Sequence, residues 1–340
     1  MKTKISYSFL AAALACGLAH GQTTAYTTPI GYTTTSLPAS RFTLVGLTVQ
    51  QPMIAAGVFT AKSGTLLTAG SFNFTTLLTA GRTYILELPN GTIQEVTTWS
   101  GSTITTPDNI SSQITLSPDP SATTFKLRAA ATISTVFGAA NSVGLTPDTD
   151  GERVGTDYIQ VLNPAGAFLS YYYFNDGSND PLVVGWYGVE SGVREDNRAI
   201  VYADGLYVQR AAGVTKSLVV SGEVKTKPTA GILSVGFSYL SGVAPAGLTL
   251  ANSSLSSQIT PDTAGELTSN DFVLIQQPSG AYLQYYYFND GSNDPLVVGW
   301  YGVESGVRED TKPLDGGFLI LNRGVSKPYN ISVPPSFPSL

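Results

Sequence analysis

Two short acidic loops have the residue types and spacing of a calcium site. Their oxygen-bearing side chains are Asp176, Ser178 and Asp180 in one loop and Asp290, Ser292 and Asp294 in the other. Oxygens at positions 1, 3 and 5 are what an EF-hand loop offers to Ca²⁺. Positions 6 and 12 of that motif are Pro181 and Tyr187 instead of Gly and Glu. Asp-Gly is also a preferred tight-turn dipeptide, so a polar hairpin tip is the favoured interpretation and a sparse calcium site is the alternative.

The densest charges of the chain follow each acidic loop, in the segment Val-Glu-Ser-Gly-Val-Arg-Glu-Asp. Its carboxylates are Glu190, Glu195 and Asp196 in one copy and Glu304, Glu309 and Asp310 in the other. Two carboxylates at a suitable separation can hydrolyse a glycosidic bond without histidine. The segment is polar and interrupted by Gly, which is typical of a solvated loop, and spacing alone does not place two carboxylates on opposite sides of a bond. We therefore assign no catalytic residue.

Aromatic residues crowd the strands around these loops. Side chains alternate along a strand, so rings fall on both faces and one face is expected in the core. The other face is either buried as well or forms a stacking platform for sugar rings. Burial is the favoured interpretation, because exposed aromatic patches are uncommon on soluble monomers. The candidate binding residues of the platform are Tyr171, Tyr173, Trp186, Tyr187, Tyr285, Tyr287, Trp300 and Tyr301.

The single histidine and the single cysteine, His20 and Cys16, lie in a segment that we expect to be a signal peptide. A basic start is followed by the uncharged apolar residues 5–15 and by a small-x-small site that ends at Gly21. Cleavage there would leave no imidazole and no thiol. We thus expect no Ser-His-Asp triad, no Cys nucleophile, no disulfide, and a secreted, periplasmic or cell-surface location.

Composition limits the partners. The 340 residues include 18 basic and 24 acidic residues, and without residues 1–21, which carry two lysines and no acid, the net charge is −8. Nucleic acids and anionic membranes are bound by Lys/Arg patches, and we find none. No later stretch has the roughly 18 apolar residues of a transmembrane helix. Abundant Gly, Thr, Ser and Tyr favour strands over helix or disorder.

An internal duplication organises the second half of the chain. Residues 171–196 are identical to residues 285–310, at an offset of 114 positions. The match extends upstream, and downstream it continues as 207–210 against 320–323. A period of this length is typical of whole domains in tandem.

Pro and Gly in short turns connect apolar runs, as in a β-hairpin. The turns are Asn163–Gly166, Gln277–Gly280 and Pro89–Gly91. The pattern predicts an all-β fold of two or three tandem β-sandwich or small-barrel modules. We predict the division as follows: 1–21 signal peptide, 22–132 N-terminal β module, 133–227 first β repeat unit, 228–340 second β repeat unit.

Several short motifs, taken in order, resemble a known family. They are Pro29–Tyr32, Leu44–Leu47, Ala80–Glu87, Thr124–Arg128, Ile133–Gly138, Gly185-Trp186 and Ser221–Val224. The chain resembles a large paralogous family of secreted, signal-bearing β-rich proteins from Verrucomicrobia and related bacteria, a family without an established function. The resemblance extends to about residue 227 and implies an extracytoplasmic, non-enzymatic protein.

We therefore expect an exported, non-enzymatic structural or binding protein of the cell envelope or extracellular space, which presents tandem β modules to a polysaccharide or a protein partner. It would need no cofactor, with calcium as the one candidate ion. A carboxylate-dependent glycan hydrolase or lyase is one alternative, for which two carboxylates must share a cleft. An outer-membrane β-barrel is another; the prolines and the long tandem repeat disfavour it.

Overall fold

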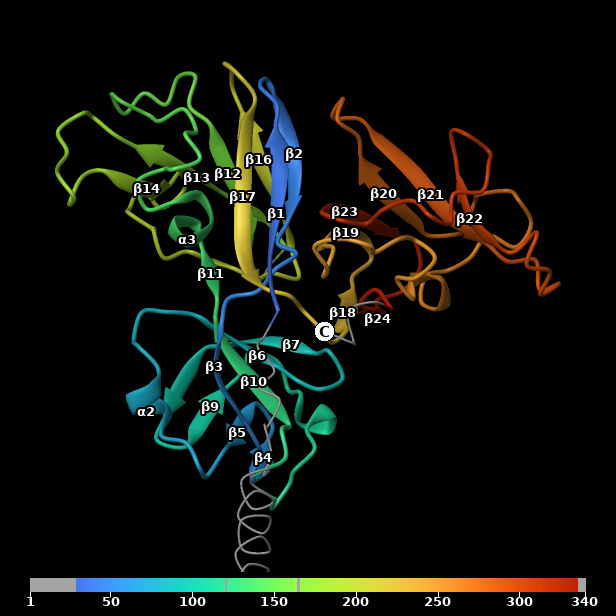
Figure 1. Cartoon of the computed structure of the whole chain (residues 1–340), viewed down its shortest axis with the longest axis horizontal. Coiled ribbons are helices and arrows are strands. Elements are labelled where there is room, and N and C mark those ends of the chain that lie inside the picture. Colours follow the sequence, from blue (N-terminus) through green and yellow to red (C-terminus); the bar gives the residue numbers. More distant parts are fainter. Residues whose placement is uncertain (1–28, 120, 164–165, 336–340) are drawn as a thin grey trace, which may run out of the picture.

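A computed structural model describes residues 29–119, 121–163 and 166–335. The expected signal peptide lies outside these residues. The described chain is nearly all antiparallel β-structure, so the all-β prediction is confirmed, and none of its sheets closes on itself. Three bodies are distinguished: an insert module (51–130), a first repeat module (29–50 with 131–225) and a second repeat module (226–335). Figure 1 shows the insert module below the first repeat module, with the second repeat module beside the first repeat module.

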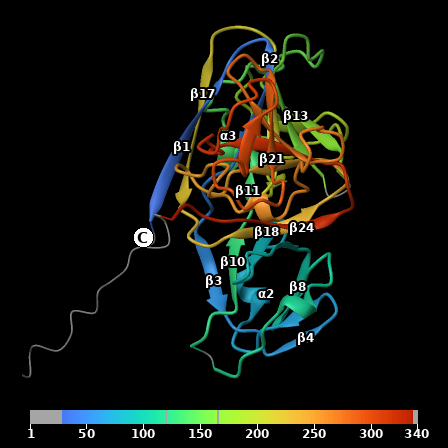
Figure 2. The same ribbon diagram turned by 90° about the vertical axis from the view of Figure 1, so that its right-hand side faces the viewer.

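The first repeat module is built on a five-stranded sheet of order β14-β13-β12-β16-β2. A long two-stranded ribbon, β1 with β17, packs over one face (Figure 2) and encloses a core that contains Leu37, Ile159 and Leu218. The elements are β1 (Ile30–Leu37), β2 (Arg41–Gly46), β11 (Ala131–Thr132), α3 (Ile133–Phe137), β12 (Tyr158–Leu162), β13 (Phe168–Phe174), β14 (Gly185–Gly188), β15 (Ala199–Ile200), β16 (Gly205–Arg210) and β17 (Lys216–Glu223).

The second repeat module has a sheet of the same plan, β22-β21-β20-β23-β19, with the ribbon β18-β24 in the place of β1-β17. Its elements are β18 (Thr229–Leu233), β19 (Gly236–Ser241), η2 (Leu255–Ser257), β20 (Phe272–Gln276), β21 (Tyr282–Phe288), β22 (Gly299–Gly302), β23 (Gly317–Asn322) and β24 (Lys327–Ile331). At the β20–β21 turn, Gly280 adopts φ +91° and its N–H donates to the carbonyl of Gln277 at 2.8 Å. Only Gly adopts this backbone without strain, which explains its place in the motif.

Downstream of the identical blocks, the sheet register differs from the sequence alignment. The sequence alignment pairs residues 207–210 with 320–323, but the ladders place Arg210 level with Asn322 instead of Arg323. That part of the alignment is wrong by one residue. In a strand such a slip exchanges the two faces, and accordingly Arg210 and Asn322 are buried while Arg323 is exposed.

The slip explains how each module neutralises one buried carboxylate. In the first, Asp157 accepts a hydrogen bond from Arg210 Nε at 2.6 Å, and both side chains are inaccessible. In the second, Asn322 occupies the arginine's place, and Asp271 pairs with Lys327 of β24. A buried carboxylate without a cation is strongly destabilising, so the cation is present in both modules although it comes from different strands.

The insert module consists of two four-stranded antiparallel sheets, β3-β10-β6-β7 and β4-β5-β9-β8, around a core of Phe59, Phe74 and Phe125. Its elements are β3 (Met53–Gly57), β4 (Ala61–Ser63), β5 (Leu66–Thr68), α2 (Phe74–Leu77), β6 (Tyr84–Glu87), β7 (Ile93–Val96), β8 (Thr98–Ser100), β9 (Thr103–Thr105), η1 (Ser111–Gln113) and β10 (Phe125–Ala129). Because β2 pairs with β16 and β1 pairs with β17, residues 30–46 complete the sheet and the ribbon of the first repeat module, and the insert module interrupts that module in sequence. The predicted boundary after residue 132 thus assigns strands of one sheet to two units.

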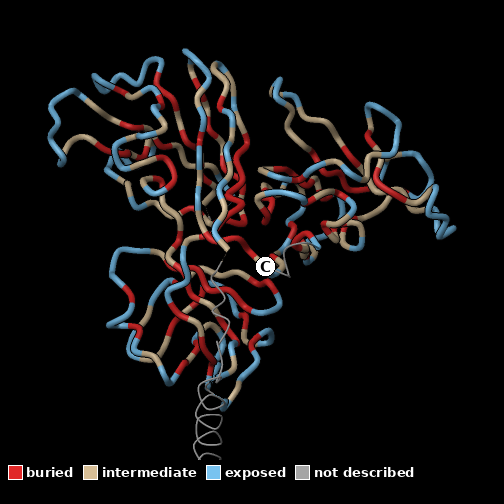
Figure 3. Tube along the Cα trace, viewed as in Figure 1, coloured by how far each residue is buried: buried red, intermediate tan, exposed pale blue. Residues whose placement is uncertain are grey.

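The modules are packed closely against one another. A Cβ added to Gly46 of the first repeat module would lie 2.5 Å from backbone atoms of Gly316 in the second. The Ser241 N–H donates to the Ala203 carbonyl at 2.9 Å across the same junction. Figure 3 shows the buried trace inside each module and at this junction, with exposed trace at the outer loops.

Candidate functional site

A cleft of about 1400 Å³ lies where all three modules meet and is here called the junction cleft. The insert module contributes Glu95 and Asp108, and the loop before β15 of the first repeat module contributes Asn197. The second repeat module contributes Phe237 and Tyr239 of β19. Ligand sites are commonly found at interfaces between domains, and this cleft is larger than most sites for small molecules.

One wall is fixed by a hairpin tip of the insert module. Gly91 has φ +93°, and its carbonyl accepts a hydrogen bond from Ala230 N at 2.8 Å, which joins the tip to β18. A Cβ on Gly91 would lie 2.7 Å from the Pro228 carbonyl oxygen. Conformation and space both require glycine here, so the Pro-Asn-Gly turn predicted from sequence also docks one module on another.

Two carboxylates from different modules line the junction cleft and interact through their charges. Asp204 lies in the turn before β16, and Glu95 lies on β7. Burial, together with the negative charge of Glu95, raises the pKa of Asp204 to about 7. Burial, with a contribution from Asp204, also raises the pKa of the Tyr329 hydroxyl. A carboxyl that is half protonated near neutral pH can bind as an acceptor or a donor, and it can transfer a proton.

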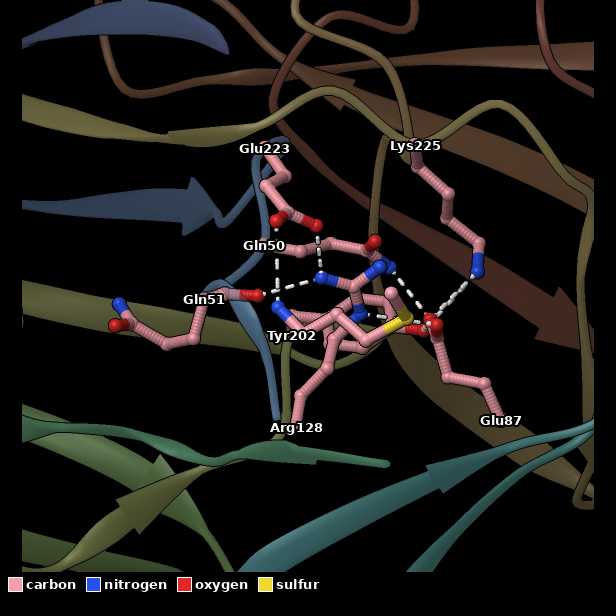
Figure 4. A network of polar contacts seen from close by, with 8 residues as sticks. Gln50, Gln51, Glu87, Arg128, Tyr202, Glu223 and Lys225 are labelled. Carbon is pink, nitrogen blue, oxygen red and sulfur yellow. Dashed lines mark hydrogen bonds and ion pairs between the residues drawn. The ribbon is translucent and has the colours of Figure 1, made fainter. Parts of the chain in front are cut away.

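A buried network of polar contacts ties the insert module to the first repeat module (Figure 4). Its centre is Glu87 of β6, whose Oε1 accepts hydrogen bonds from Gln50 Nε2 at 2.6 Å, from Lys225 Nζ at 2.9 Å and from the Tyr202 hydroxyl. Arg128 Nε donates to Glu87 Oε2 at 3.0 Å. One carboxylate therefore joins β6 and β10 to three segments of the first repeat module.

Arg128 extends the network to a second carboxylate. Its Nη1 donates to the Gln51 carbonyl at 2.6 Å and to Glu223 at the end of β17. Two acids and two bases leave the network electrically neutral. Burial alone would raise the pKa of Glu87, but the Lys225 and Arg128 cations outweigh it and lower that pKa to about 2. The network therefore has a structural role: it holds the two modules together, and each of its charges is paired with an opposite charge.

The structure places most candidate platform residues in the module cores. Five of them are almost inaccessible, and they are Tyr171, Tyr173, Trp186, Tyr285 and Trp300. Tyr287 packs against the second core. Of these candidates, only Tyr187 and Tyr301 lie on the outer face, and each is half-buried. Each ring lies beside another tyrosine: the ring centroids are 6.1 Å apart for Tyr187 and Tyr172 and 5.9 Å apart for Tyr301 and Tyr286. The six inward residues therefore serve packing, and no surface platform is made of them.

The acidic loops use their oxygens to build turns. Asp176 Oδ1 accepts a hydrogen bond from Ser178 N at 2.9 Å, and Asp180 Oδ1 accepts one from Leu182 N at 2.8 Å. Asp290, Ser292 and Asp294 repeat these contacts. Within the described residues, no three acidic, His or Cys side chains gather where they could hold a metal. Such Asx turns are what the hairpin-tip interpretation expects.

The charged segments also bind their own hairpins. Asp196 Oδ1 accepts a hydrogen bond from Trp186 N at 2.9 Å and its other oxygen pairs with Arg194, while Glu195 accepts from Ser191. Glu190 accepts from Ser170 N. In the second copy Glu304, Glu309 and Asp310 make the same contacts. Identical sequence thus gives identical local structure in both modules.

The surroundings of the two copies differ. Residues 194–198 of the first copy line the junction cleft, whereas residues 308–312 of the second do not. Trp186 Nε1 donates to the Gly138 carbonyl at 2.9 Å, but Trp300 Nε1 is buried without a partner among the described residues. The duplication therefore gives both modules the same local structure, and the packing of the insert module makes only the first copy part of the junction cleft.

The sequence alone does not single out the two carboxylates of the junction cleft. Glu95 and Asp204 belong to different modules, and no spacing rule relates them. Asp204 lies in a turn between β15 and β16, and an acidic residue in such a place is as typical of a turn as of a site.

Comparison with models of protein families, with curated proteins and with solved structures found no match to the chain. None of the helices in the described ranges is long and apolar enough to cross a membrane.

Proposed function

We propose that the chain is an exported, non-enzymatic binding protein of the cell envelope or extracellular space, and that its junction cleft holds a segment of a polysaccharide without a cofactor. The observation that supports this most is the junction cleft, whose walls come from three modules locked together by the Gly91 tip and the Glu87 network. Preorganised walls lower the entropic cost of binding.

The chemistry of the lining favours a carbohydrate over a basic or acidic macromolecule. Acids, Arg198, amides such as Asn197 and the rings of Phe237 and Tyr239 all occur along the junction cleft. Hydroxyl groups pair with carboxylates and amides, and aromatic rings pack against the C–H faces of sugars. A protein segment is the other partner class, and it is an outcome of the test.

The test uses a matched pair of variants in the duplicated loops. Asn197 lines the junction cleft, and Thr311 is its exposed counterpart in the second copy, outside the junction cleft. Glycan arrays and envelope polysaccharides would be probed with the protein from residue 22, with and without calcium. We expect Asn197→Trp to abolish binding and Thr311→Trp to leave it intact. Binding that survives Asn197→Trp, or that occurs only to envelope proteins, would contradict the proposal.

The carboxylates Asp204 and Glu95 in the junction cleft support a second candidate function, a carboxylate-dependent glycan hydrolase. Asp204, with its raised pKa, would protonate the leaving oxygen, and Glu95 would activate water for attack at the anomeric carbon. Release of reducing ends from a bound polysaccharide, lost in both Asp204→Asn and Glu95→Gln, would establish this function. Binding without release of reducing ends in the unmodified protein would exclude it for that polysaccharide and leave the first proposal.

A further inference from the structure

A second hollow lies between the outer faces of the two repeat sheets, here called the tyrosine cleft, with a volume of about 610 Å³. This is within the roughly 300–1,000 Å³ of sites for small molecules. Its aromatic walls are Phe42, Phe168 and Tyr207 from the first repeat module and Tyr239 and Tyr282 from the second. Tyr239 also lines the junction cleft, so the two hollows meet at one side chain.

The rings are held in fixed orientations by contacts across the two modules. Phe168 packs edge to face on Tyr239, with centroids 4.8 Å apart, and Tyr207 packs likewise on Tyr239 at 5.9 Å. The hydroxyls of Tyr207 and Tyr282 hydrogen-bond to each other at 2.8 Å. Burial raises the pKa of both hydroxyls, so they stay neutral. Phe42 stands at 86° to Tyr207 and remains 43% exposed.

Polar groups accompany the rings. Gln160 projects from the middle of β12 into the tyrosine cleft. Arg41 lines it too; its Nη1 donates to the Pro278 carbonyl at 2.5 Å, while its Nε is buried without a partner among the described residues. Gln276, by contrast, is used within the protein, because its Oε1 accepts a hydrogen bond from Leu44 N at 2.7 Å. An amide and a guanidinium beside aromatic rings suit a ligand with one apolar face and a rim of hydroxyls.

We propose that the tyrosine cleft is a subsite for one pyranose residue of a glycan, occupied by a ring that continues the chain lying in the junction cleft. The C–H face of the pyranose packs against the exposed aromatic surface, and its hydroxyls bond to Gln160 and Arg41. A uronate ring gives the same stacking and adds a carboxylate for the guanidinium. This inference rests on the proposed function for the longer chain and adds a second, separately addressable site.

The experiment is calorimetric titration with a neutral glucan hexamer, a galacturonan hexamer and the corresponding disaccharides. Phe42→Ala and Gln160→Ala alter only the tyrosine cleft, and Tyr32→Ala, another exposed aromatic that lines neither hollow, is the control. We expect each cleft variant to weaken at least one hexamer and its disaccharide about tenfold, which corresponds to the loss of about 1.4 kcal/mol. Tyr32→Ala should bind as the unmodified protein does.

The outcomes separate this subsite from the proposed function. Loss of hexamer binding in Asn197→Trp with disaccharide binding retained supports both. Hexamer binding that is abolished by Asn197→Trp but unchanged by Phe42→Ala and Gln160→Ala overturns the subsite and keeps the junction cleft. Disaccharide binding lost in the tyrosine-cleft variants, with hexamers indifferent to Asn197→Trp, keeps the subsite and overturns the proposed function. No binding of any probe overturns the subsite.

Discussion

Replacing Glu87 by Gln should destabilise the junction between the insert module and the first repeat module in a pH-dependent way. In the folded protein the pKa of Glu87 is lowered from 4.5 to about 2. Each pKa unit corresponds to 1.36 kcal/mol, so the ionised carboxylate contributes on the order of 3 kcal/mol. A lowered carboxyl pKa means that this stability is complete above pH 4.5 and is lost as the pH falls toward 2. Between pH 6 and pH 3, about 2 kcal/mol of it should disappear.

The assay is urea denaturation of the unmodified protein and Glu87→Gln at pH 6 and pH 3, with Glu266→Gln, an exposed carboxylate, as the control. We expect Glu87→Gln to lower the free energy of unfolding of the affected transition by about 3 kcal/mol at pH 6, because two buried cations then share one acid. The difference should shrink to about 1 kcal/mol at pH 3. A difference below about 1 kcal/mol at pH 6, or one that grows on acidification, would refute the reasoning.

Three further predictions use sites where the structure offers an internal comparison. Asp204→Asn should stabilise the protein by about 2 kcal/mol at pH 8 and have little effect at pH 4. A carboxyl whose folded-state pKa is raised to about 7 destabilises the fold as the pH rises and the group ionises, and water at the cleft wall screens part of this cost. Equal effects at both pH values would contradict this. Gly91→Ala should destabilise the protein by about 1–3 kcal/mol and enlarge its radius of gyration in small-angle scattering. The added methyl group strains the backbone at positive φ and clashes with the Pro228 carbonyl oxygen. An unchanged radius and stability would count against the docking of this hairpin tip on the second repeat module. Trp186→Phe should destabilise the protein by about 1 kcal/mol more than Trp300→Phe in thermal denaturation. Of these two indoles, only Trp186 Nε1 has a hydrogen-bond acceptor among the described residues. The reverse order of stability would contradict this account of the two cores.

Much of the local structure could be predicted from sequence because it depends on neighbours in the chain. The Asx turns at Asp176 and Asp180, the glycine at Gly280 and the alternation of Tyr171 to Phe174 follow from backbone geometry and period-2 strands. Alternation does not say which face is core. That depends on the ribbon β1-β17, whose strands lie far apart in sequence.

The cleft depends on contacts that no local rule contains. The insert module interrupts the first repeat module because β2 pairs with β16. The paired residues are 159 to 169 positions apart, and strand propensity cannot specify such a pairing. The strand pairing of β23 likewise determines the one-residue slip, by which Asn322, and not Arg323, occupies the place that Arg210 has in the first repeat module. Glu95 and Asp204 line the same cleft only because these long-range pairings bring two modules together.

The most direct test of the proposed function is hydroxyl-radical footprinting of the protein with and without a bound polysaccharide. We predict protection in three segments at once: around Glu95 in the insert module, at residues 194–198 in the first repeat module, and at Phe237 and Tyr239 in the second. The matching residues 308–312 should react equally in both states. Protection confined to one module, or equal protection of both copies of the duplicated loop, would contradict a binding site formed by the junction of the three.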